Sequence, residues 1–317
     1  MSDSGLFDLT VHHLRFRCCA QTPIHLGPQA GAQIRGGLWQ SLETIAPGVP
    51  VESDRHPLYR LMEMERDSAR GSNPARPLAI RPPLAPRAER DRNYRPGETF
   101  DIGITLYGDA AVYFPYIALA MNHLGQNGTG YGRGRFVVSA IHALNERAGM
   151  MQDLLDATRH LRSPQIPLTG QQVRDWAAHL PADKLRIRFL TPTQIRHQGR
   201  FLAEPNFCAI IARLLERCQA LEYHYGSPAP AEIWERRHSM LTMAAQDIRI
   251  VQDNTRWVSA QAGSRRSNRR LNLGGFVGEV LLTGNLEPFR EWLLWGEALH
   301  VGKNAIKGDG WYEIGPA

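Results

Sequence analysis

An order of strands and helices that occurs twice along the chain limits the possible folds most strongly. Alternating apolar and polar residues predict strands, and apolar residues spaced three or four positions apart predict helices. In the first half these patterns place strands at 7–20, 78–83, 99–108 and 132–141 and helices at 30–43 and 113–125. In the second half they place strands at 184–195, 247–258, 271–284 and 310–314, helices at 206–226 and 287–300, and a further helical stretch at 231–246. Both halves therefore follow the order β-α-β-β-α-β.

This order is that of the split βαβ unit, a recurring motif of small α+β domains. The sequence therefore predicts an α+β fold built from tandem ferredoxin-like (RRM-like) modules. We expect an N-terminal module over 1–141, a partly helical connecting segment over 142–183, and a C-terminal module over 184–317. A chain of 317 residues is long enough for two such domains, each with its own core.

The charge balance indicates the kind of partner. The formal net charge is +6, which favours a polyanion such as nucleic acid. No apolar run approaches the roughly 18 residues that spanning a membrane requires. The chain also begins with acidic residues where a secretory signal would be basic and then apolar, so we expect a cytoplasmic protein without a membrane partner. The cysteines and histidines lack the spacings of metal ligands, and we therefore expect neither a metal site nor a cofactor.

Two glycine-rich loops occupy the same position in the two predicted modules. The first reads LGQNGTGYGRGRF (124–136), and the second reads VGKNAIKGDGWYEI (301–314). Glycines let a backbone approach a ligand closely, and successive exposed N–H groups form an anion-binding concavity. The alternative is that these glycines only make tight turns. Basic side chains within both loops favour an anion, and in the second loop we predict contacts with it from Gly302, Lys303, Lys307, Gly308 and Gly310.

A run of arginines is the strongest chemical feature of the sequence. No acidic residue occurs between Asp253 and Glu279, while SRRSNRR (264–270) holds four arginines. Guanidinium groups bind phosphates through two hydrogen bonds and stack on unpaired bases, which makes RNA the expected partner. A solvated basic loop is the alternative. The predicted RNA-binding side chains of this run are Arg265, Arg266, Arg269 and Arg270.

The tandem modules and the glycine-rich loop before the last strand resemble the RAMP superfamily of CRISPR-associated proteins. The resemblance is to their repeat-processing endoribonucleases in particular, and it covers 95–136, 190–226 and 264–314. Its most specific part is a helix followed by HVGK at 300–303. Beyond Lys303 the chain departs from the usual pattern of these proteins at Asn304, Lys307, Asp309 and Trp311.

This resemblance implies that the protein cuts precursor CRISPR RNA within its repeats to give mature guide RNAs. The implied reaction is metal-independent: the 2′-hydroxyl attacks the adjacent phosphorus and leaves a 2′,3′-cyclic phosphate. The implied partners are CRISPR repeat RNA and other CRISPR-associated proteins of an effector complex. Histidine suits the proton transfers, because its reference pKa of about 6.5 makes both forms available near neutral pH.

In the resembling enzymes this histidine lies in or near the first helix, but AGAQIRGGLWQSLE (30–43) contains none. The candidates are His25, in the loop before the helix, and then His56, in the loop after it. His300 adjoins the second glycine-rich loop, where we expect it to bind carbonyl groups at a helix end.

Two other functions compete with cleavage. A relative without catalytic activity could hold guide RNA in a CRISPR ribonucleoprotein, and the absence of a histidine from the first helix favours it. A nucleotide-binding signalling domain on the same fold would need an acidic metal pair such as GGDD, which the sequence lacks.

Overall fold

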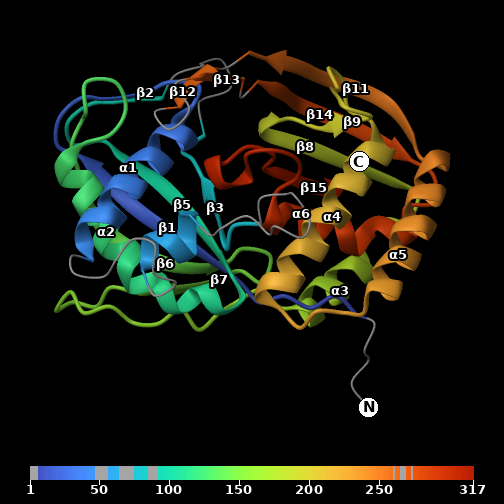
Figure 1. Cartoon of the computed structure of the whole chain (residues 1–317), viewed down its shortest axis with the longest axis horizontal. Helices are drawn as coiled ribbons and strands as arrows, with labels where there is room; N and C mark the ends of the chain where they lie inside the picture. Colours follow the sequence, from blue (N-terminus) through green and yellow to red (C-terminus); the bar gives the residue numbers. More distant parts are fainter. Residues whose placement is uncertain are drawn as a thin grey trace. The chain divides into compact units, whose positions relative to one another are not determined.

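The protein is described by a computed structural model over residues 6–46, 56–63, 75–84, 92–259, 261–264, 269–272 and 274–317 (Figure 1). It divides into two compact units. The N-unit is Thr10–Leu168, and the C-unit joins Met1–Leu9 to Thr169–Ala317. Each unit is an antiparallel sheet with helices, as the repeated element order predicts.

The N-unit contains a five-stranded sheet in the order β3-β5-β1-β6-β7. The strands are β1 (Val11–Ala20), β3 (Leu78–Arg81), β5 (Thr99–Tyr107), β6 (Phe136–Asn145) and β7 (Met150–Asp153), and the helices are α1 (Ala30–Ile45) and α2 (Phe114–Asn127). Without β7, the chain order β1-α1-β3-β5-α2-β6 and the sheet order are those of a ferredoxin-like domain. A separate ribbon pairs β2 (Ile24–Leu26) with β4 (Arg92–Tyr94).

Apolar side chains at helical spacing hold α1 and α2 on one face of this sheet (Figure 1). Ile34 and Leu38 on α1 are fully buried, as is Met121 on α2. At Gly37 a Cβ atom would lie 2.3 Å from a methyl carbon of Leu124, so the glycine permits close packing of the two helices. Burial of these faces, more than intrinsic helix propensity, stabilises both helices.

The C-unit repeats the arrangement with a four-stranded sheet in the order β11-β14-β8-β15. Its strands are β8 (Lys184–Thr193), β11 (Arg249–Val258), β14 (Gly275–Thr283) and β15 (Tyr312–Pro316), and its helices are α3 (Gly170–His179), α4 (Phe207–Tyr225), α5 (Ala231–Ala244) and α6 (Arg290–Leu299). Two short hairpins pair β9 (Arg196–His197) with β10 (Arg200–Phe201) and β12 (Gln261–Ser264) with β13 (Arg269–Asn272). Thus β8-α4-β11-β14-α6-β15 confirms the predicted second βαββαβ order.

Short helical turns complete the list of elements. A π-helical turn covers Tyr59–Glu63, and 3₁₀ turns cover Gly108–Tyr113, Ala245–Asp247, Glu287–Phe289 and Ala305–Lys307. No helix in the described ranges is both long and apolar enough to cross a membrane.

The segment before β1 contributes to the core of the C-unit. Phe7 is 1% exposed, and its ring centroid lies 6.0 Å from that of Trp234 and 4.8 Å from that of Trp295. Asp8 accepts a hydrogen bond from the Gly170 backbone N–H at the start of α3. The first residues of the chain therefore belong with the unit formed by its second half.

The range 142–183, which the sequence predicts as a connection, contains regular structure. Strand β6 continues to Asn145, β7 pairs with it, and α3 begins at Gly170. Thr169 caps α3 in a capping box with Gln172, which satisfies N–H groups that the first turn leaves without helical partners.

Candidate nucleic-acid interface

The glycine-rich loop of the N-unit packs against β2, the strand that carries His25. The backbone N–H of Tyr131 donates to the His25 carbonyl at 2.8 Å, and Thr129 pairs with Gly134 across the loop. At Gly130 a Cβ atom would lie only 2.3 Å from the His25 carbonyl oxygen, and φ there is +72°. A glycine is therefore required at this position for the loop to contact β2.

The His25 side chain is exposed and has a defined partner. His25 lies directly opposite Asn93 on β4, and its Nδ1 is 3.0 Å from the Asn93 Oδ1. An amide oxygen only accepts hydrogen bonds, so the tautomer that makes this bond carries its proton on Nδ1. In that tautomer Nε2 is the acceptor nitrogen of the imidazole.

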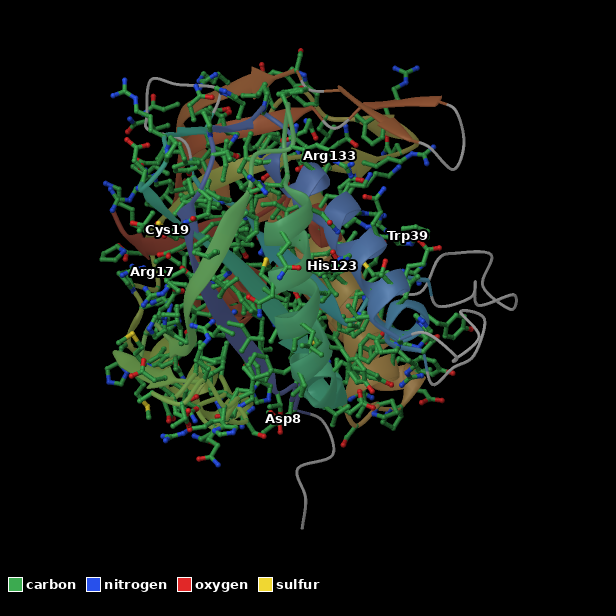
Figure 2. All side chains as sticks on the ribbon, turned by 90° about the vertical axis from the view of Figure 1, so that its left-hand side faces the viewer. Asp8, Arg17, Cys19, Trp39, His123 and Arg133 are labelled. Carbon is green, nitrogen blue, oxygen red and sulfur yellow. The ribbon has the colours of Figure 1, made fainter. Side chains whose placement is uncertain are left out.

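Positive charge and an exposed aromatic ring accompany this histidine. Arg133 and Arg135 are exposed in the same loop, and Tyr131 is 63% exposed. Figure 2 shows Arg133 beyond the end of α2, the helix that carries His123. No acidic residue occurs from 110 to 145, so nothing in this stretch of sequence neutralises the loop. The arrangement combines a base with cations that suit a phosphate.

His56 lies in a different environment. Its side chain is 0% exposed, and its Nδ1 accepts a hydrogen bond from the Leu58 backbone N–H at 3.0 Å. Where the structure places it, this imidazole packs inside the N-unit and has no surface that an RNA phosphate could reach. The geometry therefore favours His25 over His56 as the histidine of the site.

The glycine-rich loop of the C-unit does not have the open row of N–H groups that its sequence predicts. Gly302, Gly308 and Gly310 have φ values of +81°, +87° and +74°, which other residues rarely adopt. Gly308 and Gly310 are buried, and their N–H groups donate to the Ala305 and Pro192 carbonyls. At Gly310 a side chain would clash with the Val301 carbonyl of the same loop. These two glycines therefore shape the loop rather than face a ligand.

The two lysines of this loop differ in exposure. Lys303 is exposed, and its ammonium lies 5.0 Å from the centre of the Phe201 ring. Lys307 is half-buried, and its Nζ donates to the Asn304 Oδ1 at 3.4 Å. Lys303 is consequently the lysine of this loop that is better placed to meet a ligand.

Comparisons with known proteins bear on the family and the fold. Residues 187–312 match the family model of the CRISPR-associated endoribonuclease Cas6. This part of the chain is therefore similar to Cas6 proteins. Residues 9–166 match a family model described as an N-terminal domain. No curated protein matches the sequence of the chain.

Solved structures share the fold along nearly its whole length. Thermus thermophilus Cas6 in a product complex is 19% identical with a TM-score of 0.58, and the match covers 97% of this chain and 99% of that one. A chain of a Cas6-RT-Cas1–Cas2 complex is 14% identical with a TM-score of 0.62, covering 98% of this chain and 46% of that one. A RAMP protein binding different RNA substrates is 12% identical with a TM-score of 0.51, covering 96% and 99%. At these identities the structures establish the fold of the chain, including its tandem ferredoxin-like units.

The predicted arginine run is only partly described. Arg265 and Arg266 lie outside the described residues, and of Arg269 and Arg270 the structure describes the backbone, in β13. This strand pairs with β12 in a hairpin that follows β11 in the chain. Their contacts with RNA remain a prediction from the sequence.

His300 binds a carbonyl group, but it is one of the loop and not of the helix end. His300 follows α6, is fully buried, and its Nδ1 lies 3.2 Å from the Asp309 carbonyl oxygen. Its ring stacks on Trp311, which is half-buried, with centroids 6.2 Å apart. Trp257 on β11, by contrast, is 36% exposed.

Sequence reasoning missed Asn93 and Phe201. Asn93 lies 68 residues after His25 in the chain, on a strand of three residues, and no local pattern connects the two. Phe201 had a detectable signal, since HQGR (197–200) places a glycine in a two-residue turn between polar residues. That turn brings Phe201 close to Lys303, which the sequence alone could not reveal.

The buried carboxyl of Asp309 predicts a pH-dependent stability of the C-unit loop. Burial raises its pKa well above the usual range, while the Lys307 charge and a hydrogen bond with Asn304 partly oppose this shift. A raised folded-state pKa favours the folded protein at acidic pH, and this contribution is lost as the pH rises through that pKa. Asp309→Asn is therefore expected to raise the thermal midpoint by a few degrees at neutral pH, measured by differential scanning calorimetry.

The control for this prediction is Asp247→Asn, which alters an exposed carboxylate of the same unit. The gain from Asp309→Asn should shrink as the pH falls toward the ordinary pKa of aspartate, because the wild-type carboxyl is then neutral in both states. A gain that is equal at acidic and neutral pH would contradict the assignment.

Proposed function

We propose that the chain is a metal-independent endoribonuclease that cuts precursor CRISPR RNA within its repeats to give mature guide RNAs. The observation that carries the proposal is the match of residues 187–312 to the Cas6 endoribonuclease family. The likeness of nearly the whole chain to Thermus thermophilus Cas6 in a product complex supports it.

In the proposed reaction the 2′-hydroxyl next to the scissile phosphate attacks phosphorus, and the bond from phosphorus to the 5′-oxygen breaks. The 5′-oxygen takes a proton from water, so the products are a 2′,3′-cyclic phosphate and a 5′-hydroxyl. His25 accepts the proton of the 2′-hydroxyl through Nε2, while the Asn93 amide oxygen holds Nδ1. Arg133 and Arg135, exposed in the adjoining loop, stabilise the negative charge that develops on the phosphate oxygens.

Binding of the RNA is assigned to the basic side chains of the C-unit. Lys303 and the run Arg265, Arg266, Arg269 and Arg270 neutralise phosphates, and Gly302, Gly308 and Gly310 shape the loop that carries Lys303. Lys307 adds a further positive charge to the same loop. Association with other CRISPR-associated proteins, in the cytoplasm, belongs to the same proposal and is supported by the likeness to a chain of a Cas6-RT-Cas1–Cas2 complex.

The test is cleavage of repeat RNA in excess EDTA, followed by analysis of the new ends. Cleavage is expected to persist at an unchanged rate and to leave a 2′,3′-cyclic phosphate on one product and a 5′-hydroxyl on the other. The repeat should come from the same genome as the protein, and a scrambled repeat of equal length is the control. Products with a 5′-phosphate, or activity that returns only with a divalent cation, would refute this mechanism.

The second candidate is a relative that binds guide RNA without cutting it. Helix α1 (Ala30–Ile45) contains no histidine, and this observation favours the second candidate. It predicts tight binding of repeat RNA with the substrate intact after prolonged incubation. The same experiment therefore separates the two functions.

A further inference from the structure

The hairpin β9–β10 presents an aromatic ring and two arginines at the surface of the C-unit. Gln198 and Gly199 form its two-residue turn, with φ values of +46° and +80°. Positive φ at both positions is the type I′ turn, whose twist matches that of paired strands. Arg196 lies directly opposite Phe201, so both side chains share one face of the hairpin.

Phe201 lies beside the glycine-rich loop rather than in a core. Phe201 is 44% exposed, so its ring is accessible from solvent. The Lys303 ammonium lies 5.0 Å from the ring centre, within cation–π distance. An exposed ring and an exposed ammonium are therefore held next to each other.

Backbone hydrogen bonds hold the loop that carries Lys303 next to the hairpin that carries Phe201. The Lys303 N–H donates to the Gln194 carbonyl at 3.1 Å, and at Gly302 a Cβ atom would lie 2.5 Å from the same oxygen. Just past the hairpin, the Leu202 N–H donates to the Ile195 carbonyl at 3.0 Å. The loop and the base of the hairpin are thus joined at adjacent residues, so the ring and the ammonium need little ordering when a ligand binds.

The charge of the hairpin is positive. Arg196 and Arg200 are exposed, and no acidic residue occurs from 184 to 203. The Arg196 Nε donates to the Gly199 carbonyl at 3.1 Å, which orients its guanidinium. An aromatic face among cations is the arrangement that binds single-stranded nucleic acid, because bases stack on the ring and phosphates meet the cations.

We propose that Phe201 and Lys303 form a subsite for one unpaired nucleotide of the bound RNA. The base stacks on the Phe201 ring, and the Lys303 ammonium pairs with the phosphate of that nucleotide. Arg196 and Arg200 meet neighbouring phosphates. The subsite rests on the proposed function, and it adds a position at which the RNA must be unpaired.

The first test compares variants of Phe201 in binding to non-cleavable repeat RNA. Phe201→Ala is expected to weaken binding by about 5- to 150-fold, the effect of losing one base–aromatic stack. Phe201→Trp should retain the affinity, whereas Phe201→Leu, which keeps an apolar side chain, should lose it as Phe201→Ala does. Tyr223→Ala is the matched control, since Tyr223 is 52% exposed on α4 of the same unit.

The second test locates the base. Abasic sugars are placed one at a time along the repeat, and each RNA is measured with wild-type protein and with Phe201→Ala. At the position that stacks on Phe201, the abasic RNA should bind both proteins equally, because each change removes the same contact. Pairing that segment with a complementary strand should also remove the difference between the two proteins.

The possible outcomes distinguish failure of the subsite proposal from failure of the proposed function. If wild-type protein binds and cuts repeat RNA but Phe201→Ala and Phe201→Leu bind as tightly as wild type, the subsite is wrong and the function stands. If Phe201→Leu alone retains wild-type affinity, the contact is apolar rather than stacking, which also overturns the subsite. If wild-type protein neither binds nor cuts repeat RNA, the proposed function fails and the subsite with it.

Discussion

Replacing His25 by alanine is expected to slow single-turnover cleavage of repeat RNA by at least about 10², since a positioned general base contributes about 10²–10⁴ in rate. RNA affinity should stay nearly constant, because the imidazole acts on the 2′-hydroxyl and the phosphates are bound by arginine and lysine side chains. The fold should also persist, as the side chain is exposed and its described contact is the bond to Asn93. Rates are measured with enzyme in excess over labelled repeat.

The matched control is His160→Ala, which removes another exposed histidine of the N-unit. An RNA with a 2′-deoxy sugar before the scissile phosphate supplies the background rate, because it lacks the attacking hydroxyl. His25→Ala acting on normal RNA should remain above that background, since proton transfer to water is still available. An unchanged rate in His25→Ala would remove His25 from the site and direct attention to His56, which would then have to become accessible.

The sequence predicted the fold because both units bury their helices and sheets in a regular way. Alternation along β1 places Leu14 and Phe16 in the core, and the helices carry apolar residues at four-residue steps. These periodicities are local, so they can be recognised in the sequence without knowledge of the tertiary structure. The prediction that the first strand begins at Phe7 was wrong, since β1 begins at Val11. No local pattern indicates that Phe7 packs with tryptophans more than two hundred residues away.

The candidate site was less predictable than the fold. Glycine content predicted a loop that contacts an anion, but it did not show that Gly308 and Gly310 are buried and donate their N–H groups within the protein. The partner of His25 depends on the pairing of two strands of three residues each, and such short strands have no period of their own. The position of Phe201 beside Lys303 likewise depends on where a hairpin and a loop meet. Sites assembled from loops rest on these long-range contacts, which a single sequence does not encode locally.

Replacing Arg265, Arg266, Arg269 and Arg270 by alanine is expected to flatten the salt dependence of RNA binding. Each phosphate contact contributes roughly 0.7 to the slope of log K against log[salt] for single-stranded RNA, so four contacts contribute about 2.8. If the variant and the wild type bind equally at about 1 M salt, this difference in slope makes the variant's affinity lower by a factor on the order of 10² at about 0.15 M salt. Lys303→Ala should lower the slope by about 0.7, and Arg236→Ala, which changes an exposed arginine on α5, should leave it unchanged.

A second quadruple variant distinguishes the effect of the positive charge from the effect of the guanidinium shape. With lysine at the four positions, the salt slope should match that of the wild type, because the same number of counterions is released. Its affinity should nevertheless fall, since an ammonium neither binds phosphate through two parallel hydrogen bonds nor stacks on a base as a guanidinium does. Binding is measured by fluorescence anisotropy over a series of salt concentrations, with thermal unfolding as the check on the fold. If the alanine variant is folded and keeps both the affinity and the slope of the wild type, the RNA lies elsewhere and the arginine run is a solvated loop.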